Sequence, residues 1–323
     1  MSDSASIELL DLAPPRADFR SEVLDGLASS PKTVAPKFFY DQRGSELFER
    51  ICEVDEYYPT RVETALLEER ADEIVELLGD RPLLIEYGSG ASRKIRVLLE
   101  RLSTGAHYLA IDISREHLID SAEALAQDYP KIDVFAVCGD YSQPLELPAD
   151  ALEAAGKRTV FFPGSTIGNF YPREAREFLR NAARLVGPGG GMLIGVDLKK
   201  DRAQLEAAYD DAEGVTAEFN LNLLTRINRE LDADFELGAF EHRACYNAEA
   251  GRVEMHLHSL ADQSVSIGDE RIPFAEGETI HTENSYKYAV AEFQRMAADC
   301  GFSAERVWTD PNELFSVHFL RAI

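Results

Sequence analysis

Residues 82–90 read Pro-Leu-Leu-Ile-Glu-Tyr-Gly-Ser-Gly, and this stretch decides the fold. Its apolar first half predicts a short buried strand that ends at a glycine turn. Gly88 and Gly90 allow the backbone to turn tightly and to approach a ligand closely. The third glycine of a complete dinucleotide-binding fingerprint is missing. The stretch therefore predicts a ligand site at the end of a strand, without a complete dinucleotide motif.

Apolar runs alternate with helical periodicity on the C-terminal side of this turn. Near-continuous apolar strands separated by helices are typical of a parallel sheet covered on both faces, and they predict an α/β domain. The expected strands are 82–87, 108–113, 132–138, 159–162 and 192–197, and the expected helices are 95–102, 116–128 and 172–185.

The alternation stops after residue 197, where the pattern becomes that of an α+β domain. One or two helices are expected over 199–232, antiparallel strands over 236–288, a helix over 289–298 and two final strands at 304–308 and 315–320. Helices are also expected at 17–27 and 63–78. We therefore expect two domains. The first comprises residues 61–197 and 287–323, and the second comprises residues 1–60 and 198–286.

Acidic residues end two of the expected strands. Asp112 ends the second strand and Asp140 follows the third. The carboxyl ends of parallel strands lie at one edge of the sheet, where open α/β folds bind their ligands. An acid placed like Asp112 accepts hydrogen bonds from both hydroxyls of a ribose. The alternative is that the glycines mark an ordinary loop and that Asp112 caps a helix.

The charge balance excludes some classes of function. The chain has 323 residues with 33 Lys+Arg and 58 Asp+Glu, a formal net charge of −25. Nucleic-acid binding and attachment to anionic membranes both need basic surfaces, so we expect neither partner. The 17 Phe and 12 Tyr are enough to build a large core, which argues against disorder.

The first residues lack a basic region followed by an apolar stretch, so we expect no leader segment. No apolar run approaches the roughly 20 residues that span a bilayer. Four widely spaced cysteines form no CxxC pair, and the seven histidines show no metal-binding spacing. We therefore expect reduced thiols, no metal, a cytoplasmic location and, without an extended apolar seam, a monomer.

The glycine turn and the strand-end acids resemble the class I S-adenosylmethionine-dependent methyltransferases. Cys138-Gly-Asp140 and the Pro-Gly-Gly-Gly turn at 188–191 add to this resemblance. It implies a seven-stranded sheet that ends in an antiparallel hairpin. It also implies that the glycine turn faces the methionyl part of the cofactor, that Asp112 binds the ribose and that Asp140 lies by the adenine. The implied cofactor-binding residues are Gly88, Ser89, Gly90, Lys94, Asp112, Asp140 and Tyr141.

Other segments, which span both expected domains, carry a more specific resemblance. They are residues 37–41, 44–48, 56–61, 164–169, 208–211 and 282–285. From about residue 30 to the C-terminus, they resemble the histidine-specific Nα-methyltransferase of ergothioneine biosynthesis. The resemblance implies that S-adenosylmethionine methylates the α-nitrogen of free L-histidine three times, which gives hercynine. It implies that Asn169, Tyr57 and Tyr209 surround the substrate amine and carboxylate.

The same resemblance implies that Glu283 and Ser285 bind the imidazole. Tyr40, Phe48, Gly164 and Met255 complete the implied substrate site, and Tyr40, Tyr57 and Asn169 are the implied catalytic residues. On a strand, Glu283 and Ser285 share a face. Their carboxylate and hydroxyl suit the two nitrogens of an imidazole. We expect the hydroxyl of Tyr40 or Tyr57, or a water held there, to receive the amine proton.

Several alternatives remain open at this point. Asn169 also fits the cap of a helix that begins near Pro172, and Glu283 and Ser285 also fit a solvent-facing strand. Other classes of function are a nicotinamide-dependent oxidoreductase and a non-catalytic sensor of an amino acid or cofactor. Among methyltransferases, the rival is an enzyme for another aromatic amino acid. Glu283 discriminates against it, because tryptophan offers only one N–H donor in its ring.

Overall fold

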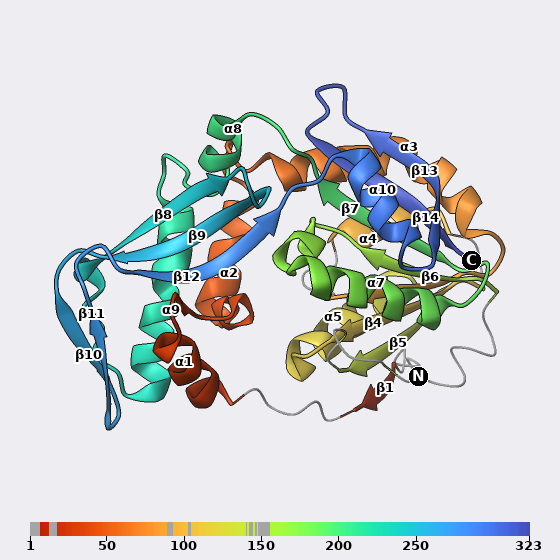
Figure 1. Ribbon diagram of the computed structural model, residues 1–323. Helices are drawn as coiled ribbons and strands as arrows, with labels where there is room; N and C mark the ends of the chain where they lie inside the picture. Colours follow the sequence, from red (N-terminus) through yellow and green to blue (C-terminus); the bar gives the residue numbers. More distant parts are fainter. Residues whose placement is uncertain are drawn as a thin grey trace. The chain divides into compact units, whose positions relative to one another are not determined.

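The computed structural model describes residues 7–12, 18–88, 93–102, 105–139, 141, 145, 147 and 156–323. The chain forms two compact units, and Figure 1 labels most of their helices and strands. The first unit contains Met1–Pro15, Val62–Leu198 and Tyr288–Ile323, and the second contains Arg16–Arg61 and Lys199–Lys287. Among the described residues, no helix is long and apolar enough to cross a membrane.

The first unit is built on one large mixed sheet. Its strands are, in spatial order, β1 (Glu8–Asp11), β5 (Asp133–Cys138), β4 (His107–Asp112), β3 (Leu83–Tyr87), β6 (Arg158–Phe162), β7 (Gly191–Asp197), β14 (Phe315–Ala322) and β13 (Phe302–Thr309). The pairs from β1 to β7 are parallel, and β14 is antiparallel to both of its neighbours. This is the α/β class and the C-terminal hairpin expected from the sequence.

The chain leaves β3 toward β4 and β5 on one side and returns to β6 on the other. Open α/β sheets bind their ligands at such a switch point, beside the carboxyl ends of the strands. The ends of β3, β4 and β6 therefore mark the edge at which a cofactor site belongs.

The N-terminal segment differs from expectation. The sequence-based division placed residues 1–60 in the second domain, whereas β1 pairs in parallel with β5 and lies in the first unit. The physical reason is edge pairing, because β5 would otherwise expose the backbone donors and acceptors of an edge strand. The pairing raises the sheet from the seven expected strands to eight.

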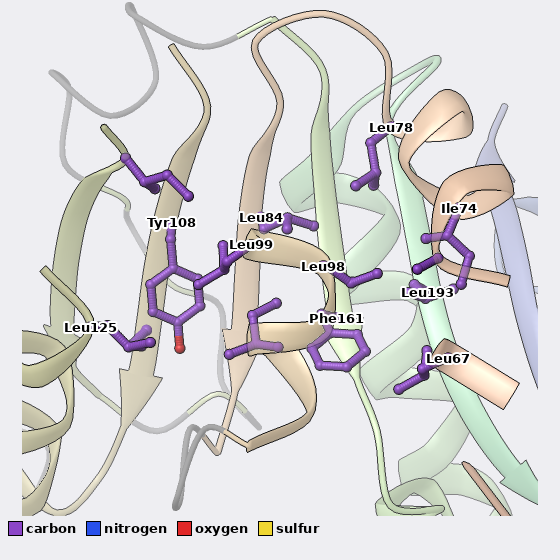
Figure 2. Packing of buried hydrophobic residues seen from close by; sticks show 14 of the residues in the cluster. Leu67, Ile74, Leu78, Leu84, Leu98, Leu99, Tyr108, Leu125, Phe161 and Leu193 are labelled. Carbon is purple, nitrogen blue, oxygen red and sulfur yellow. The ribbon is translucent and has the colours of Figure 1, made fainter. Parts of the chain in front are cut away.

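Helices pack against this sheet and form its core. They are α3 (Tyr58–Leu78, from Val62 onward in this unit), α4 (Arg93–Leu99), α5 (Arg115–Asp128), α7 (Pro172–Val186) and α10 (Val290–Ala298), with the 3-10 turn η2 (Thr166–Asn169) after β6. Figure 2 shows Leu67 and Ile74 of α3, Leu98 of α4 and Phe161 of β6 in this core. Each is 0–1% exposed, and burial of such a side chain contributes about 1.5–3 kcal/mol.

The second unit combines a four-stranded sheet with helices. The sheet order is β2 (Lys32–Thr33), β12 (Thr279–Tyr286), β9 (Arg252–Ser259) and β8 (Phe240–Asn247), and β10 (Gln263–Ile267) pairs with β11 (Glu270–Phe274) as a separate hairpin. The helices are α1 (Phe19–Ala28), η1 (Pro36–Phe39), α2 (Gln42–Ile51), α8 (Arg202–Ala207), α9 (Val215–Leu231) and η3 (Leu237–Ala239). The antiparallel strands lie within the range predicted from the sequence.

Alternation along β9 decides which face of the smaller sheet is internal. Val253, Met255 and Leu257 are buried, whereas Glu254 and His256 on the opposite face are partly exposed. Helix α9 packs against β8 and β9, and also against α2. The buried face of β9 therefore belongs to the core of this unit.

The entry into α2 depends on a close backbone approach. A Cβ atom at Gly44 would lie 1.8 Å from the carbonyl oxygen of Phe39, so only glycine fits there. The Asp41 carboxylate caps the helix by accepting a hydrogen bond from the Gly44 N–H at 2.7 Å. This local geometry fixes the positions of Tyr40 and Phe48, two of the candidate site residues.

Candidate active site

Gly88, the first glycine of the expected turn, lies at the carboxyl end of β3. Gly88 has φ of 70°, a conformation that favours glycine, and its N–H donates to the carbonyl of Ile111 at 2.9 Å. Ser89, Gly90 and Asp140, which were also expected at the cofactor site, lie outside the described residues.

Asp112 and Tyr141 lie near this turn. Asp112 ends β4, where one carboxylate oxygen accepts the Ser114 N–H at 2.8 Å. The Tyr141 ring stacks on Tyr87, with 5.3 Å between centroids and 10° between planes. A Cβ atom at Gly88 would lie 3.7 Å from the Tyr141 ring. The turn thus has a carboxylate on the neighbouring strand and a flat aromatic ring beside it.

Lys94 has a buried acidic partner that sequence reasoning missed. Its ammonium forms an ion pair with Glu63, which is 0% exposed, and the same carboxylate oxygen accepts the Gly164 N–H at 2.8 Å. Glu63 thereby links the helix after the glycine turn to the loop after β6. A sequence signal existed, since Glu63 shares a face of α3 with the buried Leu66 and Leu67.

A second buried acid, Glu86, lies within the stretch 82–90 that carries the glycine turn. Glu86 of β3 is 3% exposed, and its carboxyl accepts a hydrogen bond from the Tyr108 hydroxyl at 2.5 Å. Burial raises the pKa of Glu86 to about 8, although the hydrogen bond from Tyr108 and the charge of Lys94 act in the opposite direction.

Asn169 follows β6 and is not the cap of the next helix. It ends η2, whereas the N-terminus of α7 is satisfied by Glu174, whose carboxylate accepts the Tyr171 N–H at 2.9 Å. Asn169 is partly exposed, and its side chain forms no hydrogen bond with any described residue. The Asn169 amide therefore has no described hydrogen-bond partner. Asn169 lies at the carboxyl edge of the sheet.

An aromatic cluster gathers in the second unit. Ring centroids are 5.7 Å apart for Tyr40 and Phe48, 6.4 Å for Phe48 and Tyr57, and 6.1 Å for Tyr57 and Tyr209. Phe219 of α9, which sequence reasoning missed, lies 5.9 Å from Tyr40 and 6.2 Å from Phe48. Burial raises the pKa of Tyr57 well above its ordinary value, so its hydroxyl stays protonated.

Glu283 and Ser285 share the face of β12 that lies beside Met255 and Val253 of β9, as the sequence predicts for an i, i+2 pair, and Glu283 is partly exposed. Glu283 lies directly across from Met255 of β9, next to an irregularity in the strand pairing after His281. Ser285 is 3% exposed, which excludes a solvent-facing strand at this position. The bulge fixes which face of β12 these side chains occupy.

No described residue forms a hydrogen bond with the Glu283 carboxylate. Burial nevertheless raises the pKa of Glu283 to about 7, with Lys287 acting in the opposite direction. A buried carboxylate without an internal hydrogen-bond donor is stabilised when a ligand donates an N–H to it.

Tyr209 and Ser285 belong to a three-membered hydrogen-bond triad whose third member sequence reasoning missed. The Lys287 ammonium donates to the Tyr209 and Ser285 hydroxyls, at 2.8 Å each, and the two hydroxyls are 2.7 Å apart. Lys287 is 1% exposed, so it is a buried cation. Its position just after β12 offered no sequence signal, because lysine at a strand end is normally a solvated residue.

The backbone of Tyr209 is also held in place. The His242 Nε2 lies 2.8 Å from the Tyr209 carbonyl and must donate to it, while Nδ1 accepts from the Asn220 amide at 2.8 Å. Asp211 caps α9 by accepting the N–H groups of Val215 and Thr216, at 2.9 and 2.8 Å. Tyr209 is therefore fixed from both sides of its loop.

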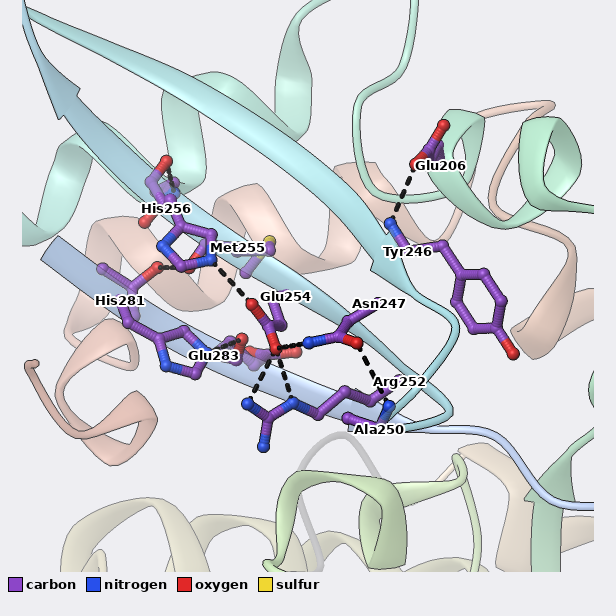
Figure 3. Close-up of polar contacts among 12 residues, drawn as sticks. Glu206, Tyr246, Asn247, Ala250, Arg252, Glu254, Met255, His256, His281 and Glu283 are labelled. Carbon is purple, nitrogen blue, oxygen red and sulfur yellow. Dashed lines mark hydrogen bonds and ion pairs between the residues drawn. The ribbon is translucent and has the colours of Figure 1, made fainter. Parts of the chain in front are cut away.

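The opposite face of β9 carries a separate polar network. Figure 3 shows that Arg252, Asn247 and His256 converge on the Glu254 carboxylate. These partners hold the pKa of Glu254 at about 2, although burial alone would raise it. Cys245, Glu254 and His256 lie close enough together to ligate a metal ion. In this structure, the Glu254 oxygens are engaged by the neighbouring side chains.

Several known proteins are similar to this chain in sequence. A histidine N-alpha-methyltransferase of Mycolicibacterium smegmatis is 41% identical over 297 residues, covering 90% of this chain and 91% of the relative. One from Mycobacterium tuberculosis is 40% identical with the same coverage. Ergothioneine biosynthesis protein 1 of Neurospora crassa is 31% identical over 90% of this chain and 33% of its own length.

Among solved structures, an S-adenosylmethionine-dependent methyltransferase of Clostridium acetobutylicum aligns with 86% of this chain and 98% of its own, at 10% identity and a TM-score of 0.48. The family model described as histidine-specific methyltransferase, SAM-dependent, matches residues 19–322, nearly the whole chain. The chain therefore belongs to the family of S-adenosylmethionine-dependent, histidine-specific methyltransferases.

Proposed function

We propose that this chain uses S-adenosylmethionine to trimethylate the α-nitrogen of free L-histidine, which gives hercynine, the first step of ergothioneine biosynthesis. The observation that carries the proposal is Glu283, a carboxylate with a raised pKa that lacks a described donor and lies beside Ser285. An imidazole offers one N–H and one lone pair, which match a carboxylate and a hydroxyl. The family and the names of the relatives support the same substrate.

The residues of the first unit suit the cofactor. Asp112 presents a carboxylate at the sheet edge for ribose hydroxyls, and Gly88 has no side chain that would block the approach of a ligand to the backbone. Lys94, held by Glu63, would pair with the cofactor carboxylate, and Tyr141 offers a flat face. Ser89, Gly90 and Asp140 remain in the proposed set. The cofactor supplies an electrophilic methyl group on a sulfonium.

The substrate residues have separate proposed roles. Asn169 has both donors and acceptors, so its amide can serve the α-amine in each methylation state, and Gly164 precedes it in the same loop. Tyr57 and Tyr209 are proposed to surround the amine and carboxylate. Glu283 and Ser285 are proposed to bind the imidazole. Tyr40, Phe48 and Met255 are proposed to supply apolar contacts to the substrate.

Methyl transfer requires a neutral amine held in line with the methyl carbon. Because the Tyr57 hydroxyl stays protonated, its proposed role is to bind the amine and pass the proton to water, not to act as a phenolate. Tyr40 is 45% exposed and offers a route to solvent. Aromatic faces also attract the methylated ammonium, which keeps fewer N–H donors after each transfer.

The test is mass spectrometry of the purified chain incubated with S-adenosylmethionine and histidine, in competition with the other nineteen amino acids. A product heavier than histidine by three methyl groups is expected. A methylated tryptophan or phenylalanine as the main product would instead assign the chain to another aromatic amino acid. Binding without any methylated product would identify a sensor.

We also propose that the chain acts as a cytoplasmic monomer without nucleic-acid or membrane partners. The net charge of −25 disfavours anionic partners, and all four cysteines are free thiols, as is typical of a reducing compartment. Light scattering coupled to size-exclusion chromatography measures the mass directly, and a mass of twice 36.0 kDa contradicts the monomer.

A further inference from the structure

The buried triad limits how the site can donate hydrogen bonds. Lys287 has no acceptor atom, so it must be the donor in its contacts with Tyr209 and Ser285. The two hydroxyls are 2.7 Å apart, and one of them donates to the other. The triad therefore uses one of its two hydroxyl hydrogens internally and directs the second one outward.

The relative acidity of the two hydroxyls decides whether Tyr209 or Ser285 donates the hydrogen bond between them. A phenol has a reference pKa near 10, far below that of an aliphatic alcohol, so it is the stronger hydrogen-bond donor. Tyr209 therefore donates to Ser285, and the Ser285 hydrogen is directed away from the triad. The serine can no longer choose freely between donating and accepting, because Lys287 and Tyr209 already occupy its acceptor positions.

We propose that Lys287 is a positioning residue that makes Ser285 a hydrogen-bond donor and thereby selects the neutral imidazole form of histidine. The proposal rests on the proposed function, in which Ser285 and Glu283 bind the ring. A donating serine requires a lone pair on the ring nitrogen that faces it. The other nitrogen then carries the N–H that Glu283 accepts, so one tautomer is bound and the imidazolium is rejected.

The charges around this site fit the same assignment. Lys287 is the titratable group whose charge acts on Glu283. Four groups act on the neighbouring Tyr57, namely Tyr209, Cys52, Glu283 and Tyr40. An imidazolium would add a cation close to the buried Lys287 ammonium, which costs energy at low dielectric. A neutral ring avoids this repulsion and still satisfies Glu283.

The first test is a double-mutant cycle of Lys287→Met and Ser285→Ala. Each single variant is expected to raise the KM for histidine about 10- to 100-fold and to change kcat much less. If Lys287 acts through Ser285, the double variant raises KM no more than the larger single effect. Multiplicative effects on KM overturn the proposal, as does a loss confined to kcat.

A matched control distinguishes positioning from general destabilisation. Lys32 is also a largely buried lysine beside β12, where it pairs with Glu278 and has no hydrogen bond or ion pair with a described candidate site residue. Lys32→Met is expected to lower the melting temperature while leaving the histidine KM within about twofold. An equal rise of KM in this variant would show that loss of a buried lysine alone explains the effect.

The closing experiment uses the wild-type chain, so it does not depend on the folding of a variant. Hercynine formation is checked first, and its absence contradicts the proposed function. Histidine labelled with ¹⁵N in the ring is then bound with S-adenosylhomocysteine at pH 5.5, where the free ring is mostly protonated. One protonated and one unprotonated nitrogen are expected in the nitrogen spectrum. A bound ring with both nitrogens protonated overturns the inference and leaves the proposed function standing.

Discussion

Glu86 and Glu283 are two acids in different units whose pKa values are raised by the same cause, yet their surroundings differ. Burial raises the pKa of Glu86 to about 8 and that of Glu283 to about 7. Glu86 has an internal donor, the Tyr108 hydroxyl at 2.5 Å, whereas no described residue donates to Glu283. An acid with its own partner completes the fold, while one without a partner is available to a ligand.

The largest effect is expected for Glu283→Ala, which removes the acid proposed to bind the ligand. It should lower kcat/KM for histidine about 10³-fold, because a site built to accept an N–H loses its acceptor. Discrimination between histidine and phenylalanine should fall in parallel. Competition assays with both amino acids measure the ratio. The control is Glu241→Ala, which removes an exposed acid on β8. A loss below tenfold would contradict the ligand role of Glu283.

The sheet edge at which we propose the cofactor site was predictable from the sequence because its signals are local. A strand period, a glycine turn and an acid at each strand end together place Gly88 and Asp112 at one edge. Sequence also separated the parallel region from the antiparallel one, since the two patterns differ in periodicity and spacing. The hairpin at the C-terminus was likewise predicted, and β13 and β14 form it.

The features that sequence reasoning missed depend on contacts between distant segments. Glu63 meets Gly164 across 101 positions, and Lys287 meets Tyr209 across 78. The sequence around Lys287 does not distinguish it from a solvated charge, and the apolar helix face that carries Glu63 does not by itself reveal the partner of that acid. The pairing of β1 with β5 was missed for the same reason, because a four-residue strand gains its stability from the edge that it joins.

The second-largest effect is expected for Lys94→Met. This change removes the cation that pairs with Glu63, a buried acid to be compared with Glu86 and Glu283. Glu63 is fully buried, and Lys94 is its ion-pair partner. Breaking a partly buried pair leaves an uncompensated charge, so the free energy of unfolding should fall by about 3 kcal/mol. The double variant Glu63→Gln/Lys94→Met should recover part of this loss. Urea denaturation measures both, and a double variant that is less stable than Lys94→Met would refute the pairing argument.

A smaller effect, which depends on pH, is expected for Glu86→Gln. The unfolded chain releases the Glu86 proton near pH 4.5, and the folded chain keeps it until about pH 8. Between these values the unfolded state binds fewer protons, so the wild type loses stability as the pH rises. The amide cannot ionise, so the variant should gain about 2 kcal/mol relative to the wild type between pH 6 and pH 7.5, because one pKa unit is worth about 1.4 kcal/mol. Equal pH profiles would show that Glu86 is not held protonated.

The smallest effect is expected for Tyr108→Phe, which makes Glu86 resemble Glu283 by removing its donor. Tyr108 is fully buried, so the phenylalanine ring still fills its space, while the hydroxyl that donates to Glu86 is removed. That bond favours the ionised acid, so its loss should raise the pKa of Glu86 further. Above pH 8 the variant should be about 1 kcal/mol less stable than the wild type, and the difference should shrink at pH 5. The matched control is Tyr246→Phe, whose hydroxyl forms no hydrogen bond with a described residue. If Tyr108→Phe lowers the free energy of unfolding equally at pH 5 and above pH 8, the Tyr108 hydroxyl contributes to packing only. The contrast between Glu86 and Glu283 would then depend on burial and not on a hydrogen-bond donor.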